Sequence, residues 1–171
     1  MVVAVVVIAV DQLTKWWAVD SLQDRTIHVV WTLELQLTRN TGAAFSRFVG
    51  QGPLIALAAL AIVGYLLWQG RTVSTRLGAV AIGMVLGGAL GNLTDRAFRG
   101  GSGFLEGAVV DFINPQWWPV FNVADACVVV GAILLVVVNL FGPAARHDGD
   151  DRAAGASDDP GAAGAAGAAP A

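Results

Sequence analysis

Two aspartates near the start of the last long apolar run could act together as an acid and a base. Asp111 lies in VVDFINP and Asp125 in FNVADACVVVGAILLVVV, fourteen positions apart. A carboxylate at the edge of a hydrocarbon region costs free energy unless it is paired or wetted, so it is first considered a functional candidate. Burial and a like-charged neighbour both raise a carboxylate pKa, which would let one acid keep a proton while the other activates water.

Further polar residues stand where they could join the two acids. They are Asp11 with Lys15, Asn40 and Gly42 in the loop NTGAAF, Asn92 with Asp95 and Arg96 in NLTDR, and Asn122. Structural explanations remain open for several of them. Asp11 and Lys15, at i,i+4 spacing, could simply neutralise each other on one helix face. Asn122 could cap the last helix, and Asp95 with Arg96 could pair at the surface where a helix ends.

Other kinds of catalytic site find little support in the sequence. His28 and His147 are the only histidines, and neither adjoins another ligand at the spacing of a zinc site. Serine and cysteine nucleophiles therefore lack a plausible histidine base. The single cysteine, Cys127, stands in an apolar run and is expected to be a small buried side chain. Metal-free carboxylate chemistry without a cofactor is the prediction that remains.

The composition indicates a membrane protein. The 171 residues have a mean hydropathy of +0.64, and only 13% are charged. Up to residue 145 there are eight basic and eight acidic residues, so the net charge of −3 comes from the tail. No basic stripe is available to displace counterions from phosphates, and nucleic acid is not an expected partner.

Four apolar stretches are each close to the ~20 residues that cross a bilayer. They span about 1–19, 53–69, 77–93 and 120–141. The first has neither a basic lead nor a cleavage site, so it is predicted to be a retained helix with the natural start upstream of Met1. In the last, a start near Pro119 would place Asp125 six residues into the helix, ~9 Å below its end.

Two further patterns predict how these helices are arranged. Apolar and polar residues alternate from Ile27 to Thr38, which favours one amphipathic strand in a small sheet outside the hydrocarbon region. Gly83, Gly87 and Gly91 recur at four-residue spacing, which is typical of a membrane helix that a neighbouring backbone approaches closely.

With four crossings, the loops 20–52 and 94–119 share one side of the membrane, and both termini share the other. Basic residues are nearly balanced between the two sides, so the residues alone leave the orientation open. Residues 144–171 are polar and then rich in Ala and Gly, which predicts a disordered tail.

Five motifs in order resemble the lipoprotein signal peptidase family, the type II signal peptidases. They are DQLTKWWA from Asp11, RNTGAAFS from Arg39, GGALGNLTDR from Gly87, VVDFI from Val109 and FNVADA from Phe121. The resemblance implies an all-α polytopic membrane protein with four transmembrane helices and a small extracytoplasmic β-cradle. It implies a peptidase domain over residues 1–143, a cytoplasmic tail over 144–171, and a bacterial plasma membrane location with the active site near the extracytoplasmic face.

The same resemblance implies an aspartyl endopeptidase that cuts diacylglyceryl-modified prolipoproteins immediately before the lipidated cysteine. Its catalytic pair falls on Asp111 and Asp125. Substrate-binding or supporting roles fall on Asn40, Gly42, Asn92, Arg96, Asn122, Asp11, Lys15 and Asp95. Partners are the prolipoprotein substrates and membrane lipids, with the chain expected to act as a monomer. A proton-coupled transporter and a non-catalytic membrane scaffold are the alternatives, since paired intramembrane acids also serve proton relays.

Overall fold

The computed structural model describes residues 1–42, 52–71, 73, 75–100 and 103–141. Residues Met1–Phe141 form one compact unit. The predicted disordered tail over 144–171 lies outside the described residues, as do Ala43, Ala44 and Phe45 of the predicted site loop.

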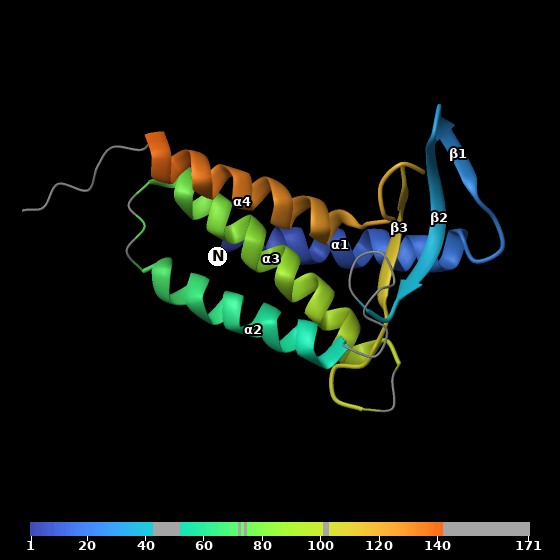
Figure 1. Ribbon diagram of the computed structural model, residues 1–171, viewed down its shortest axis with the longest axis horizontal. Coiled ribbons are helices and arrows are strands. Elements are labelled where there is room, and N and C mark those ends of the chain that lie inside the picture. Colours follow the sequence, from blue (N-terminus) through green and yellow to red (C-terminus); the bar gives the residue numbers. More distant parts are fainter. Residues whose placement is uncertain (43–51, 72, 74, 101–102, 142–171) are drawn as a thin grey trace, which may run out of the picture. The chain divides into compact units, whose positions relative to one another are not determined.

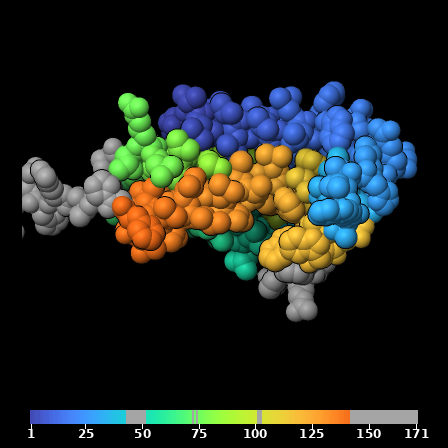
Figure 2. Space-filling view, turned by 90° about the horizontal axis from the view of Figure 1, so that it is seen from above, coloured from blue at the N-terminus to red at the C-terminus, as the bar shows by residue number. Residues whose placement is uncertain are grey.

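Four helices make up most of this unit: α1 (Val2–Ser21), α2 (Gly52–Gln69), α3 (Arg76–Phe98) and α4 (Val123–Phe141). Each is long and apolar enough to cross a membrane. Much of their apolar surface faces outward, including Leu57 on α2 and Ile133 on α4. Figure 2 views a face on which α1 and α4 present such surface. The chain is a multi-pass membrane protein, as the composition predicts.

Helix α3 packs against each of the other three helices (Figure 1), and its glycines allow α1 and α4 to approach it closely. A Cβ added at Gly87 would lie 2.7 Å from the Val7 Cβ of α1, and one at Gly83 would lie 2.8 Å from the Val3 Cβ. Gly88 faces the Ala124 carbonyl of α4 in the same way. The close backbone approach predicted from the glycine spacing is therefore confirmed.

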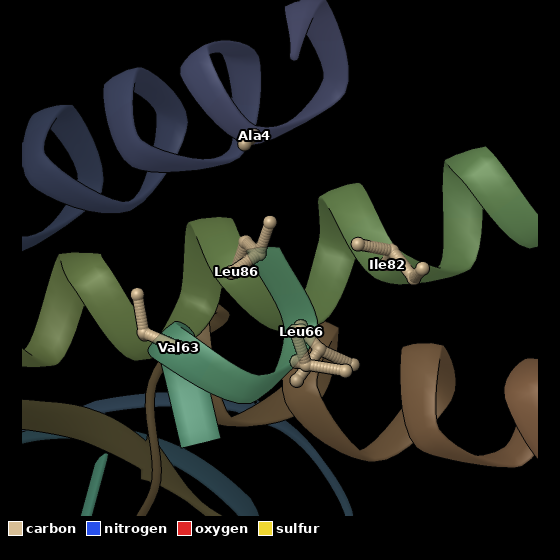
Figure 3. Close-up of a cluster of buried hydrophobic side chains, with 6 residues drawn as sticks. Ala4, Val63, Leu66, Ile82 and Leu86 are labelled. Carbon is tan, nitrogen blue, oxygen red and sulfur yellow. The ribbon is translucent and has the colours of Figure 1, made fainter. Parts of the chain in front are cut away.

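An apolar cluster joins α1, α2 and α3. It consists of Ala4, Val63, Leu66, Ile82, Val85 and Leu86, all buried. Figure 3 shows Val63 and Leu66 of α2 facing Ile82 and Leu86 of α3, with Ala4 of α1 above them. Close packing of these apolar side chains therefore joins the three helices in this part of the bundle.

Three antiparallel strands form a sheet in the order β1-β2-β3: β1 (Ile27–Val30), β2 (Leu33–Asn40) and β3 (Val109–Asn114). Figure 1 places the sheet at one end of the helices, with the end of α2 and the start of α3 at the other. Buried residues of the sheet and of α1 form a second apolar cluster: Ala18, Leu22, Val110 and Phe112, with Ile27, Leu35 and Leu37 packed against them.

The single strand predicted from Ile27 to Thr38 is wrong in one respect. The chain turns back at Trp31, whose φ of 49° lies in the left-handed region, so the segment forms a hairpin. The predicted apolar face is not kept along the whole segment, because Val29 and Trp31 stand exposed while Leu33 and Leu35 are half-buried. Periodicity alone could not locate the turn.

Two helix boundaries differ from the predicted ones, and both changes affect the polar residues. Helix α3 runs on to Phe98, so Asp95 and Arg96 lie inside its last two turns. Helix α4 begins at Val123 instead of near Pro119, because Phe121 is still hydrogen-bonded to Ile113 in a β-bridge. Asp125 is therefore the third residue of α4, not the sixth.

Candidate active site

Asp111 and Asp125 reach one cavity from two different elements. Asp111 is the third residue of β3, and Asp125 is the third residue of α4. Both line a cavity of about 360 Å³. The other polar residues in its lining are Asn40, Gly42, Asn92 and Arg96. The structure thus brings together residues that the chain separates by up to 85 positions.

Asn122 connects the two acids. Its Oδ1 accepts the Asp125 backbone N–H at 2.9 Å, and the Asp125 Oδ2 accepts the Asn122 N–H at 3.2 Å. This reciprocal pair caps α4 as the structural alternative proposed. The Asn122 Nδ2 also donates to the Asp111 Oδ1 at 2.7 Å. One fully buried side chain therefore both starts the helix and orients Asp111.

Asp125 accepts hydrogen bonds on both of its carboxyl oxygens. Its Oδ1 accepts a hydrogen bond from the Asn92 Nδ2 at 2.8 Å. Its Oδ2 accepts the Asn122 N–H, and the first turn of a helix stabilises a negative charge.

Asp111 has a different environment. It is only 2% exposed, and its Oδ2 accepts from the Asn40 Nδ2 at 3.0 Å. Asn40 pairs with Val109 across β2 and β3, which puts it diagonal to Asp111 on the same sheet face. Burial and the neighbouring Asp125 charge raise the pKa of Asp111 from its ordinary value of 3.8 to about 6. Asp111 is therefore suited to keep a proton closer to neutral pH than an ordinary aspartate does.

Behind the two acids lies a group of buried charges, here called the Lys15 network: Lys15, Asp11 and Asp95. The Lys15 Nζ lies 2.9 Å from the Asp11 Oδ2 and 3.1 Å from the Asp95 Oδ2, and all three side chains are fully buried. The pairing of Asp11 with Lys15 is confirmed. The alternative of a surface pair between Asp95 and Arg96 is wrong, because both residues are buried and the α3 helix continues past them.

Two members of this polar region were missed from the sequence. Gln12 donates through Nε2 to the carboxyls of Asp11 (3.2 Å) and Asp95 (3.1 Å), and the Arg99 Nε lies 2.6 Å from the Asp95 Oδ1. Gln12 stands inside the DQLTK motif, and Arg99 follows Asp95 at i,i+4 spacing. The motif could have indicated Gln12 as a member of the polar region, and the i,i+4 spacing from Asp95 could have indicated Arg99.

The Lys15 network touches the chain immediately before each acid. The Asp11 Oδ1 accepts the Ala124 N–H at 3.0 Å, and the Asp95 Oδ2 accepts the Val110 N–H at 3.0 Å. Lys15 also donates to the Asn92 Oδ1 at 2.8 Å. The backbone of both acids is therefore anchored to one buried ion group.

Arg96 brings a positive charge to the cavity. Its Nη2 donates to the Gly42 carbonyl at 2.8 Å. Its Nη1 is buried and has no hydrogen-bond partner among the described residues. A buried donor without a partner carries a desolvation cost, which a bound acceptor would remove.

The rest of the cavity is apolar and follows three helices. Its lining comes from α2 (Ile55, Ala56, Ala59, Ile62), α3 (Val85, Ala89, Leu93) and α4 (Val128, Val129), together with Val109 of β3. A ligand with a polar segment and an apolar segment fits this lining.

Metal ligands do not gather anywhere in the described ranges, which contain no group of three or more His, Cys, Asp or Glu placed to hold an ion. His28 lies in the hairpin, where its Nδ1 is 2.9 Å from the Glu34 Oε1. The chemistry available at the cavity is thus that of two carboxyls with amide and guanidinium donors.

Comparison with known proteins shows the family of the chain. The family model described as signal peptidase (SPase) II matches residues 3–141. The lipoprotein signal peptidase of Rhodococcus jostii (strain RHA1) is 48% identical over 82% of this chain and 72% of its own length. That of Mycobacterium avium (strain 104) is also 48% identical, over 82% of this chain and 78% of its own length.

The fold agrees with this assignment. Two solved structures of a bacterial membrane enzyme superpose with TM-scores of 0.69 and 0.68 at 29% identity. They cover 81% and 83% of this chain, and 85% and 92% of their own chains. Four helices and a small three-stranded sheet, as the resemblance implied, are the architecture of the described residues. The chain belongs to the signal peptidase II family and is a membrane peptidase of the aspartic type.

Proposed function

We propose that this chain removes signal peptides from diacylglyceryl-modified bacterial prolipoproteins by cutting the peptide bond immediately before the lipidated cysteine. The observation that carries the proposal is the pair Asp111 and Asp125, joined through Asn122 at the polar part of a cavity whose remaining lining is apolar. Membership of a peptidase family favours this activity over the proton-coupled transporter and the membrane scaffold.

In this mechanism Asp125 begins ionised and Asp111 begins protonated. Asp125 takes a proton from a water molecule whose oxygen attacks the scissile carbonyl carbon, while Asp111 gives its proton to the carbonyl oxygen. In the resulting diol intermediate, the C–N bond breaks as Asp125 returns its proton to the leaving amine. As the C–N bond breaks, Asp111 takes back a proton from one hydroxyl of the diol, which leaves a carboxyl product and restores the original dyad.

Substrate binding is divided between the two parts of the cavity. The Arg96 Nη1, which has no hydrogen-bond partner in the described part of the chain, would hold a backbone carbonyl of the substrate. Asn40 orients Asp111, and Gly42 presents its backbone beside Arg96. The apolar lining would hold the hydrophobic signal segment and the acyl chains, which bring the scissile bond to the depth of the acids.

The proposal places the protein in the bacterial plasma membrane with the cavity near the extracytoplasmic face and both termini in the cytoplasm. Asp111 lies on β3 and Asp125 at the start of α4, so both acids belong to the sheet end of the helices, the end that the proposal places towards the extracytoplasmic side. A monomer suffices, because all residues of the proposed site come from one chain. We expect no metal or organic cofactor to be required.

The decisive experiment is cleavage of a diacylglyceryl-modified prolipoprotein by the purified full chain in detergent. Cleavage should occur before the lipidated cysteine and should persist in a chelator. The same prolipoprotein without its lipid should be cut far more slowly. Absence of cleavage by a folded preparation, with a known type II peptidase active on the same substrate, would refute the proposed function.

A further inference from the structure

We propose that Lys15 is a positioning residue that sets the geometry of the dyad and makes Asp125, through Asn92, its ionised member. This inference rests on the proposed function and adds how the two acids are given different roles. Lys15 itself does not line the cavity, so its action passes through the residues that it holds.

The first step of the argument is the geometry of two matching arms. On one arm, Lys15 pairs with Asp11, which accepts the N–H of Ala124, the residue before Asp125. On the other arm, Lys15 pairs with Asp95, which accepts the N–H of Val110, the residue before Asp111. Because one ammonium group joins both arms, the backbone of each acid is tied to the same point.

The second step concerns the orientation of Asn92. Its Oδ1 accepts from the Lys15 Nζ at 2.8 Å and from the Asn122 Nδ2 at 3.1 Å. An amide oxygen held by an ammonium group leaves only the amide N–H groups to face the other way. They face the Asp125 Oδ1, at 2.8 Å. A donor held in this orientation favours the carboxylate over the neutral acid.

The third step is the charge balance around Lys15. On α1 it meets Asp11, and on α3 it meets Asp95, which also pairs with Arg99. Within the part of the chain that the structure describes, the other charged or titratable groups that interact with the dyad or with this network are Arg96 of α3, Cys127 of α4, and the two acids themselves on β3 and α4. Lys15 and Arg99 thus balance Asp11 and Asp95. Removing Lys15 alone leaves an uncompensated negative charge behind the dyad.

The test is the pH dependence of kcat/KM for cleavage, which reports the ionisation of the free enzyme. Lys15→Met should move both limbs of the profile to higher pH, by about half a unit to one unit, since a lost cation favours the protonated dyad. Asp11→Asn should move both limbs to lower pH, because it removes a negative charge while its Oδ1 still accepts the Ala124 N–H.

Two further variants separate charge from folding. Lys15→Met with Asp11→Asn removes one charge of each sign, so its limbs should return towards those of the parent chain even if kcat is lower. Lys15→Arg keeps the charge in a larger group, so its limbs should stay in place while kcat falls. Limbs that remain in place in Lys15→Met and Asp11→Asn, with only kcat lowered, would overturn the proposal and leave a purely structural role.

A measurement without substrate distinguishes failure of this inference from failure of the proposed function. Infrared titration of the carboxyl groups in the full chain, with Asp125→Asn used to identify the Asp125 band, follows the ionisation directly. The Asp125 band should remain that of a carboxylate at neutral pH in the parent chain and gain protonated character in Lys15→Met. An unchanged band would overturn the inference, whether or not any prolipoprotein is cleaved.

Discussion

The two ends of the helical bundle are held together by different physical means. The α1–α2–α3 cluster around Val63, Leu66 and Leu86 is entirely apolar and depends on close packing (Figure 3). The end beside the sheet has its own apolar cluster between the sheet and α1, but it also buries Lys15 and Asp11 among directional hydrogen bonds. Buried ion pairs contribute little net stability compared with apolar packing, which is consistent with the positioning role proposed above for Lys15. The comparison separates residues that hold the fold from residues that hold the acids.

The sharpest test of this division is Asp125→Asn, with Asp111→Asn beside it. Each change keeps the size of the side chain and removes one acid, so we expect cleavage to fall by about 10²–10⁴-fold or more. Thermal stability in detergent should stay close to that of the parent chain. Full activity in either variant would contradict the dyad mechanism.

The change of kcat/KM with pH should be the next largest effect. The pKa of Asp111 is raised to about 6, so its proton is present at lower pH and lost as the pH rises through that value. Once the pH exceeds the pKa at which Asp111 loses its proton, we expect kcat/KM to fall about tenfold for each further pH unit. The stabilising contribution of neutral Asp111 to the fold follows the same sign: it is complete below the ordinary value of 3.8 and disappears as the pH rises through about 6.

Asn122 has both roles, because it caps α4 and also holds Asp111, and Asn122→Ala removes both. Loss of the cap should lower stability by about 1–2 kcal/mol, and loss of the link to Asp111 should lower kcat by about tenfold or more. Asn122→Ser is the matched control, because serine restores a capping oxygen without the amide donor. If serine restored kcat as well as stability, Asn122 would be a helix cap only.

Gly91→Ala tests the packing behind the acids. The new Cβ would lie 2.6 Å from the Asp11 Oδ2, so Asp11 must move and both stability and kcat should fall, stability by about 1–3 kcal/mol. Gly64→Ala in α2 is the control, because a Cβ there meets nothing within 4 Å. Equal effects of the two substitutions on kcat would show that helix propensity, not the contact with Asp11, is responsible.

At the apolar end, Leu66→Ala should have the smallest effect on catalysis. Removing this buried side chain should cost about 2–5 kcal/mol of stability, while kcat per folded molecule should remain within about twofold, since no atom of the site depends on it. A large loss of kcat in the folded variant would mean that the two ends are coupled and that the comparison is too simple.

Much of the fold follows from local patterns. The apolar runs predicted all four helices, and the glycine spacing predicted close approach between them. The depth of Asp125 was wrong because Pro119 indicated a helix start that the β-bridge between Phe121 and Ile113 prevents. The burial of Asp95 was missed because a charged helix end normally faces water, and nothing in neighbouring residues identifies Lys15 as its partner.

By itself, the sequence determined the four membrane helices, the polar residues that could form a site, and the two acids as the main candidates. Those features depend on hydropathy and spacing within short segments, which neighbouring residues encode. Only the tertiary structure decided that Asp11 holds the Ala124 N–H, 113 positions away, and that Asp111 and Asp125 share Asn122. A hydrogen bond requires atoms about 3 Å apart, and that proximity arises only when the packed helices and the sheet bring distant segments together.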